Sequence, residues 1–415
     1  MDLVVRNIDE LLTMQPGVHG TRTALGVLHD AAVAFQGQTV AWVGPSSEAP
    51  SAEETFTGRG CVGLPGLVDC HTHALFAGSR AEEFERRLAG ASYSEILEEG
   101  GGILSTVRAT RAATDEELRE SLRARLKEMW WRGVTTVEVK TGYALDTEQE
   151  LRCLRLMKGV SPSVRVVRTF LGAHTVPEEW RPDREGYVSH LVEEMLPAVA
   201  AEADMVDVYC DRGAFTLQDA RTILEAGIAL GLKGRIHAEQ VERTGAAALA
   251  AELGCLSADH LERLDQQGVE AMARAGTVAV LLPGAMTYLG DSAPPVAALR
   301  EAGVRMAVAT DFNPGSSPVL DLWTCATLAC VQMGLSVEEA LLGITRHAAA
   351  ALGRDDLGHL GVGARGGLVL CRPPPGEPAH HAVLVQYMGG QKACLIAGSG
   401  HSTLWGSDME VGGDQ

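Results

Sequence analysis

An alternation of short apolar segments with helical segments runs through the middle of the chain and limits its fold more than any other feature. The segments of strand length are residues 67–69, 134–139, 164–171, 205–209, 234–237, 256–259, 277–282 and 305–309. The helical segments between them are residues 115–132, 147–158, 185–200, 217–230, 244–252, 265–275 and 295–302. Eight strands that alternate with helices predict an α/β fold with a (β/α)8 TIM-type barrel, although a doubly wound sheet alternates in the same way.

Both ends of the chain consist of short apolar runs separated by turn residues, which is typical of β structure. These runs are residues 3–5, 32–35, 40–43, 55–57, 367–371 and 382–385. We therefore expect a small β-sandwich-like domain formed by residues 1–62 and 361–402, beside a barrel of residues 63–360 and before a flexible tail, 403–415. Residues 319–333 and 336–352 are expected to be helices, and Ser336 with Glu339 forms a capping box.

Histidines gather where the predicted strands end. In such barrels the active site lies at the C-terminal ends of the strands. Of the thirteen histidines, five fall at these ends, and an aspartate follows the eighth strand. These residues are His71, His73, His174, His237, His260 and Asp311. His71 and His73 are two residues apart, so they share one face of a strand and can bind one ion together.

The residue types in this group indicate a water-activating metal site. His71, His73, His237 and Asp311 would supply three neutral nitrogens and one carboxylate to a divalent metal. A metal with few protein ligands keeps a place for water, whose pKa falls toward about 7 on zinc. Asp311 could also accept the proton of that water, and His260 could polarise a substrate carbonyl or stabilise its oxyanion. We therefore predict hydrolysis of an amide-like C–N bond, with Asp311 and His260 as the catalytic residues.

The order of these residues resembles the amidohydrolase superfamily. Its pattern is His-x-His on strand 1, His on strands 5 and 6, and Asp on strand 8. Two-metal members add a carboxylated lysine after strand 4, whereas here that strand ends in residues 208–213 without lysine. The resemblance therefore implies one divalent metal per chain, zinc or iron. Lys140, after strand 2, is expected to be a structural cation, with a carbamate role as the less favoured alternative.

Longer stretches resemble the imidazolonepropionase family within that superfamily. They are residues 71–84, 100–111, 140–143, 170–174 and 309–316. The resemblance implies an enzyme of histidine degradation. This enzyme opens the ring of 4-imidazolone-5-propanoate with water to give N-formimidoyl-L-glutamate.

The same resemblance implies roles in substrate binding. Arg80 would bind the propionate, and Gln240 would hydrogen-bond the ring amidine. The other substrate-binding residues would be Tyr143, His174, Asn313, Gly315 and Ser316. Without the resemblance, Arg80 would be assigned to a surface ion pair and Tyr143 to the end of a strand.

The net charge of the chain limits the classes of molecule that it is expected to bind. Lys+Arg 35 against Asp+Glu 54 gives a net charge of -19, which argues against nucleic acid and anionic membrane surfaces. A small anionic substrate would then need a local cation such as Arg80. The acidic first ten residues lack the apolar segment of a signal peptide, and the nine cysteines are scattered, so we expect a cytoplasmic protein. The sequence does not fix the oligomeric state, and a homodimer is one expectation.

Two other functions are compatible with parts of this pattern. A one-metal deaminase of the same superfamily, acting on a nucleobase-like ring, would share the ligands but not Arg80, Tyr143 and His174. A catalytically inactive barrel used as an interaction scaffold would have lost ligands, whereas all of them are present in this sequence.

Overall fold

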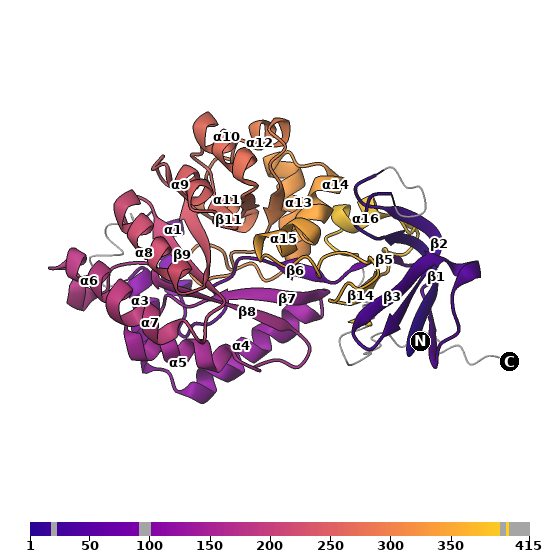
Figure 1. Cartoon of the computed structure of the whole chain (residues 1–415), viewed down its shortest axis with the longest axis horizontal. Helices are drawn as coiled ribbons and strands as arrows, with labels where there is room; N and C mark the ends of the chain where they lie inside the picture. Colours follow the sequence, from indigo (N-terminus) through magenta and orange to yellow (C-terminus); the bar gives the residue numbers. More distant parts are fainter. Residues whose placement is uncertain (18–22, 91–100, 391–395, 398–415) are drawn as a thin grey trace.

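The computed structural model describes residues 1–17, 23–90, 101–390 and 396–397 of the chain. Its larger part contains eight parallel strands that follow one another around a barrel in sequence order (Figure 1). They are β6 (Leu67–Asp69), β7 (Val134–Lys140), β8 (Arg165–Ala173), β9 (Met205–Cys210), β10 (Lys233–Ala238), β11 (Ser257–His260), β12 (Val278–Leu281) and β13 (Met306–Val308). The predicted barrel and its eight strands are confirmed.

Helices cover the outside of the barrel (Figure 1). Those that follow the first five strands are α1 (Ala81–Leu88), α3 (Ile103–Ala112), α4 (Asp115–Trp130), α5 (Thr147–Met157), α6 (Arg184–His190), α7 (Leu196–Val199), α8 (Leu217–Ala229) and α9 (Ala246–Glu252). The later ones are α10 (Gln266–Ala275), α11 (Pro283–Leu289), α12 (Val296–Glu301), α13 (Leu322–Met333), α14 (Val337–Gly343) and α15 (Arg346–Ala351). None of the helices in the described ranges is long and apolar enough to cross a lipid bilayer.

Two of the expected helices are interrupted. The segment between β8 and β9 contains a π-helical turn, Leu191–Met195, directly before Pro197, which has no N–H to donate to an α-helical bond. The segment after Ser336 is divided into α14 and α15, while its predicted capping box with Glu339 is present. This break frees the carbonyl of Ile344 to accept the N–H of Val68 in β6 at 2.9 Å.

The barrel closes just beyond its first and last strands. In the described residues, β6 pairs with β7 and β13 pairs with β12, but β6 and β13 form no ladder with each other. Instead Asp311 N donates to His71 O, and His73 N donates to Phe312 O, each at 2.9 Å. The closing hydrogen bonds therefore lie in the segments that carry the predicted metal ligands.

Both chain ends meet in a second, seven-stranded sheet beside the barrel (Figure 1). Its strands are β1 (Leu3–Leu12), β2 (Val27–Gln36), β3 (Thr39–Pro45), β4 (Glu54–Thr57), β5 (Val62–Pro65), β14 (Leu368–Cys371) and β15 (Ile396–Ala397). β5 pairs with β14, which joins the N-terminal segment to the C-terminal one. The small domain built from both ends is confirmed. Its exact boundaries stay a prediction, and the tail 403–415 lies outside the described residues.

The expected strand at residues 382–385 is instead part of a helix, α16 (His381–Gln386). His380 caps this helix, because its side chain accepts the N–H of Ala382. Val383, Leu384 and Val385 are buried, and Leu384 and Val385 belong to the main apolar core. A short apolar run fits a strand and a buried helix equally well, so the sequence pattern alone could not separate the two.

Candidate metal and substrate site

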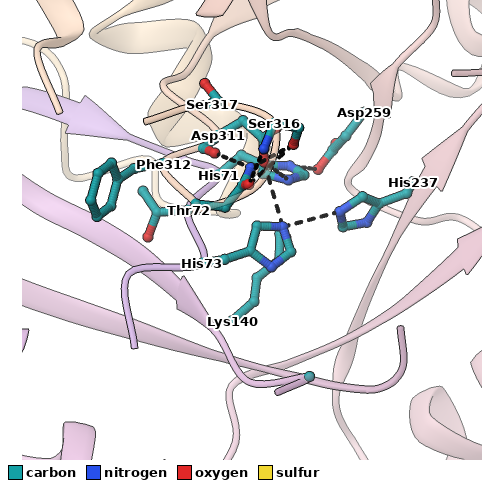
Figure 2. Close-up of polar contacts among 12 residues, drawn as sticks. His71, Thr72, His73, Lys140, His237, Asp259, Asp311, Phe312, Ser316 and Ser317 are labelled. Carbon is teal, nitrogen blue, oxygen red and sulfur yellow. Dashed lines mark hydrogen bonds and ion pairs between the residues drawn. The ribbon is translucent and has the colours of Figure 1, made fainter. Parts of the chain in front are cut away.

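The four predicted metal ligands lie together at the C-terminal end of the barrel. His71 and His73 follow β6, His237 lies in β10, and Asp311 follows β13; all four are buried. Figure 2 shows the three imidazoles and the carboxylate turned toward one another. The Oδ1 atom of Asp311 is 3.4 Å from Nε2 of His71 and 3.5 Å from Nε2 of His73. Nε2 of His73 is 3.4 Å from Nε2 of His237.

These separations fit one divalent cation. Four ligands at about 2.0–2.1 Å from a tetrahedral zinc stand about 3.3–3.4 Å apart from one another. Nε2 of His71 is buried and has no hydrogen-bond partner in the described part of the chain. His71, His73 and His237 each offer a ligand atom within 4.8 Å of the others, and so do His71, His260 and Asp311. The residues therefore suit a bound cation, and His260 borders the same space.

Two buried aspartates fix the orientation of the ligand histidines. Oδ2 of Asp259 lies 2.7 Å from Nδ1 of His71, and Oδ1 of Asp207 lies 3.1 Å from Nδ1 of His237. A carboxylate beside Nδ1 holds the proton on that nitrogen, so that Nε2 presents its lone pair. Both imidazoles are therefore prepared as neutral metal ligands.

Two buried cations compensate these carboxylates. Nζ of Lys140 lies 2.9 Å from Glu138 Oε1 and 2.7 Å from Asp207 Oδ2. Arg235 contacts Asp259 directly, and its Nη1 lies 3.4 Å from Glu138 Oε1. We call Glu138, Lys140, Asp207, Arg235 and Asp259 the charge network. Lys140 is therefore a structural cation in this structure, as expected.

Opposite charges also govern the ionisation of the network. Burial alone would raise the pKa of Asp207, but His237 and Lys140 hold this pKa well below its usual range. Burial would lower the pKa of Arg235, whereas Asp259 and Glu138 raise it. Asp207 and Arg235 therefore stay charged inside the barrel.

Sequence analysis missed every member of the charge network except Lys140. A signal was present, because Glu138 precedes Lys140 by two positions and Arg235 precedes His237 by two. Residues two apart in a strand point to the same side. The side chains of Glu138 and Arg235 therefore face the barrel interior, as the side chains of Lys140 and His237 do.

Burial sets the protonation of the ligands themselves. It lowers the pKa of His71 and His73 well below the usual range, so both are neutral, which is the metal-binding form. It raises the pKa of Asp311 well above the usual range. A divalent cation in contact with Asp311 would act in the opposite direction.

Backbone strain concentrates at this end of the barrel. Glu239, His260, Leu261 and Asp311 all have left-handed backbones, with φ of 50°, 80°, 76° and 51°. Such conformations cost about 1–3 kcal/mol each for residues other than glycine, and they cluster at functional sites. Asparagine, aspartate and histidine tolerate them best, so those at Glu239 and Leu261 are the more informative.

Two of the predicted substrate residues line the site beside His73. The His174 ring stacks on His73 at 4.9 Å between centroids, and the Tyr143 ring lies 5.9 Å from His73 and 5.3 Å from His174. Nδ1 of His174 lies 3.0 Å from the carbonyl oxygen of Gly142, and burial lowers the pKa of His174 to about 3. His174 is therefore neutral: its Nδ1–H donates to the carbonyl oxygen of Gly142, and its Nε2 is free to act as an acceptor.

Arg80 lies over the loop that follows Asp311. A Cβ atom added at Gly315 would be only 3.1 Å from Nη1 of Arg80, so the guanidinium packs on the glycine backbone. Glu83 Oε2 pairs with Arg80 Nη2 at 2.5 Å. Oε1 of Glu83 accepts from Gly102 N and from Ser105 Oγ, both at 3.1 Å. A ligand carboxylate at Arg80 would meet a guanidinium that Glu83 already orients.

The remaining predicted substrate residues are already held by other groups. The Asn313 side chain accepts from the N–H groups of Gly315 and Ser316 at 2.9 and 2.7 Å and donates to Asp311 O at 2.7 Å. It therefore shapes the loop that carries Gly315 and Ser316. Oε1 of Gln240 accepts from Tyr209 Oη at 3.0 Å. Tyr209, which sequence analysis missed, thereby orients the Gln240 amide.

A second group of possible ligands lies away from the barrel, at Glu10, His380 and His381. Glu10 Oε1 accepts from His381 N at 2.6 Å and lies 2.8 Å from His381 Nδ1, while His380 caps α16. Hydrogen bonding at the start of α16 accounts for these contacts, and we assign no metal to them.

The barrel, its closing segments and the His/Asp cluster define a metal-dependent hydrolase. The family model described as "Amidohydrolase family" matches residues 82–380. Imidazolonepropionase of Polaromonas sp. is 46% identical over 406 residues, 96% of this chain and 94% of that protein. Imidazolonepropionase of Shewanella baltica is 48% identical over 363 residues, 85% of this chain and 88% of that protein. The chain belongs to the amidohydrolase family and, within it, to the imidazolonepropionases.

Solved structures share the fold at low sequence identity. An adenosine deaminase from Xanthomonas campestris with bound zinc has a TM-score of 0.72 at 19% identity, covering 96% of this chain and 92% of its own. An atrazine chlorohydrolase from Arthrobacter aurescens complexed with zinc has a TM-score of 0.66 at 16% identity, covering 96% and 94%. At this identity the likeness supports the fold alone.

Proposed function

We propose that this chain opens the ring of 4-imidazolone-5-propanoate with water, giving N-formimidoyl-L-glutamate in histidine degradation. Water adds to the ring carbonyl carbon, the carbon–nitrogen bond breaks, and the nitrogen leaves as part of the formimidoyl group. The observation that carries the proposal is Arg80, which lies over the loop following Asp311 and offers a guanidinium to a carboxylate beside the metal ligands. The identity of 46–48% to curated imidazolonepropionases supports it.

We propose His71, His73, His237 and Asp311 as ligands of one divalent cation per chain, zinc or iron. Their 3.4–3.5 Å separations support this assignment. When bound, such a cation supplies a water of lowered pKa and withdraws charge from a carbonyl oxygen. Elemental analysis of the purified protein identifies the metal and its stoichiometry.

Asp311 and His260 would handle the protons of the reaction. Asp311 takes the proton of the attacking water and passes it to the leaving ring nitrogen. His260 donates a hydrogen bond from Nε2 to the carbonyl oxygen as negative charge develops there. Its ring lies 5.7 Å from His71 and 5.3 Å from His237, at the edge of the ligand cluster.

The propionate and the ring would be held by different residues beside the ligand cluster. Arg80 binds the propionate bidentately, beside the loop of Asn313, Gly315 and Ser316. Tyr143 and His174 contact the ring or a carboxylate oxygen, and Gln240 hydrogen-bonds the amidine. This arrangement favours a substrate with a carboxylate over neutral aminated nucleobases, because a neutral nucleobase would leave Arg80 paired with Glu83 alone.

The deciding experiment compares substrates. We expect purified protein to consume 4-imidazolone-5-propanoate and release no ammonia from a panel of aminated purines and pyrimidines. Asp311→Asn serves as the control for contaminating activity. Deamination of any panel member without turnover of imidazolonepropionate would favour the deaminase alternative. Inactivity of the metal-loaded enzyme on every substrate would favour the scaffold alternative.

We also propose a cytoplasmic location and the small anionic substrate as the principal partner. Cys70, Cys153 and Cys325 are buried free thiols, in keeping with a reducing compartment. The formal charge of -19 disfavours nucleic acid and anionic membranes. Light scattering during size exclusion measures whether the chain is a monomer or the expected homodimer.

A further inference from the structure

A buried glutamate that none of the predicted roles uses lies next to His260. Glu262 follows β11, and only 7% of its surface is exposed. Its Oε2 atom and Nδ1 of His260 are 3.9 Å apart. Both atoms are buried and lack a hydrogen-bond partner among the residues that the structure describes. Two unsatisfied polar atoms of complementary type thus face each other beside the ligand cluster.

Other buried glutamates at the same end of the barrel have evident structural partners. Oε1 of Glu150 accepts three backbone N–H groups, from Gly142, Ala144 and Leu145, at 2.8–3.1 Å. Glu239 accepts the N–H of Ala247 at 3.1 Å. Oε2 of Glu150 is also unpaired among the described residues, but Glu150 is anchored through Oε1. Glu262 has no comparable set of backbone donors, and leaving a buried carboxyl oxygen unpaired is costly. His260 is therefore its natural partner.

A strained turn places the pair. His260 and Leu261 have φ of 80° and 76°, so the chain bends sharply as it leaves β11. Leu261 N donates to Ala238 O at 3.1 Å, and Arg263 N donates to Glu239 O at 2.7 Å, which holds the bend against β10. Two successive strained residues are sustained at the point where Glu262 is brought beside His260.

We propose that Glu262 is the positioning residue of His260 and keeps a proton on its Nε2 atom by hydrogen-bonding its Nδ1 atom. This inference rests on the proposed function, in which Nε2 of His260 is a donor. The gap of 3.9 Å would close to a hydrogen bond when substrate binds, because such contacts are often long in free enzymes.

The protonation states of Glu262 and His260 favour this role. Burial raises the pKa of Glu262 to about 8. Near neutral pH the carboxyl group therefore keeps its proton and donates it to Nδ1, which leaves the imidazole proton on Nε2. If the shared proton instead moves to Nδ1, the resulting imidazolium still has its Nε2 proton. Either arrangement presents a donor to the substrate carbonyl.

The charged surroundings of the pair are mixed. Asp291 and Asp311 raise the pKa of Glu262 further, and Arg263 lowers it. His237, Lys140 and His174 lower the pKa of His260, and Asp207 raises it. The pair therefore faces acidic and basic groups from several strands, and a test must separate its hydrogen bond from the general electrostatics of the site.

Two nearly isosteric substitutions provide that separation. Glu262→Gln keeps a donor for Nδ1, because its amide can donate, whereas Glu262→Met has the same length and no hydrogen-bonding group. We expect Glu262→Gln to retain at least about half of kcat. We expect Glu262→Met to lose kcat by about 10- to 100-fold, as for other residues that orient a functional histidine, with KM and metal content within about twofold. Equal kcat values for the two variants would overturn the proposal.

Nitrogen NMR of the zinc-loaded protein tests the hydrogen bond without any substrate. With 15N-histidine labelling, the His260 signals are assigned by their loss in His260→Gln. We expect Nε2 to be protonated and Nδ1 to be hydrogen-bonded in the wild type and in Glu262→Gln, and Nδ1 to shift in Glu262→Met. Identical Nδ1 signals in all three would refute the proposal. Because this readout needs no turnover, it is independent of a failure of the proposed function.

The pH profile gives a test that survives poor folding of the methionine variant. When Glu262 ionises, its carboxylate accepts the Nδ1 proton, and a neutral His260 then loses the donor at Nε2. The kcat of the wild type should therefore fall as the pH rises through about 8, and Glu262→Gln should lack this fall. Coincident profiles would contradict the role proposed for Glu262.

Discussion

Replacing Lys140 with methionine tests whether the charge network contributes to the stability and metal affinity of the site. Lys140 is completely buried, and its ammonium contacts the carboxylates of Glu138 and Asp207 at 2.9 and 2.7 Å. Methionine nearly preserves the length and volume of the side chain and removes only the charge. The substitution therefore leaves both carboxylates buried, with Arg235 as the remaining cation of the network.

The expected loss of stability in Lys140→Met follows from the number of charges in the network. The network has two cations and three carboxylates before the substitution, and one cation and three carboxylates after it. Removing one partner of a buried ion pair costs about 3–5 kcal/mol. That is a large part of the 5–15 kcal/mol that stabilises a typical native protein. Because Asp207 also orients His237, zinc affinity should fall by about 10- to 100-fold.

The assay is urea unfolding of the metal-free protein, combined with zinc titration against a chromophoric chelator. Lys158→Met is the matched control, because Lys158 is 68% exposed and pairs with Glu202 only at the surface. Adding Glu138→Gln to Lys140→Met removes one of the excess carboxylates and should recover part of the lost stability, by at least about 1 kcal/mol. A free energy of unfolding for Lys140→Met within about 1 kcal/mol of the wild type would refute the reasoning.

Three further predictions concern the ligands and the substrate. Asp311→Asn should lower kcat by at least about 10²-fold, because it removes the proton acceptor; full turnover would exclude that role. Arg80→Ala should raise KM about 10- to 100-fold through the loss of a charge-assisted pair while metal content stays constant, and surface Arg119→Ala should change neither. Burial raises the pKa of Asp311, so zinc must displace the proton of this carboxyl group. Zinc affinity should therefore rise with pH by up to about tenfold per pH unit below that pKa. Chelator competition over a pH series measures this dependence, and an affinity that does not change with pH would contradict it.

The grouping of the four proposed ligands could be predicted from the sequence because they stand at strand ends. His71 and His73 follow an apolar run, and Asp311 follows another, so their position along the barrel axis is determined once the strands are recognised. The charge network could not be recognised in the same way. Glu138 and Arg235 alternate with apolar neighbours, which is also the pattern of a strand with one face in water. Sequence periodicity does not distinguish the interior of a barrel from solvent.

Two local structures could not be predicted from the sequence for a different reason. The role of Glu262 depends on left-handed backbones at His260 and Leu261, a conformation that leucine does not favour. The helix α16 depends on a cap from its own His380 and on burial against the main core. In both places the surrounding structure overrides local preference, and only the folded chain contains that information.

Closure of the barrel and assembly of the ligand cluster are the same event. β6 and β13 have three residues each, and the hydrogen bonds that join their ends belong to His71, His73, Asp311 and Phe312. These bonds set the 3.4–3.5 Å between the Asp311 carboxylate and the two imidazoles. A shift of β6 by one residue would turn both imidazoles to the other face. The strand end that best predicts a metal site in the sequence is therefore also the place where the fold has least freedom to vary.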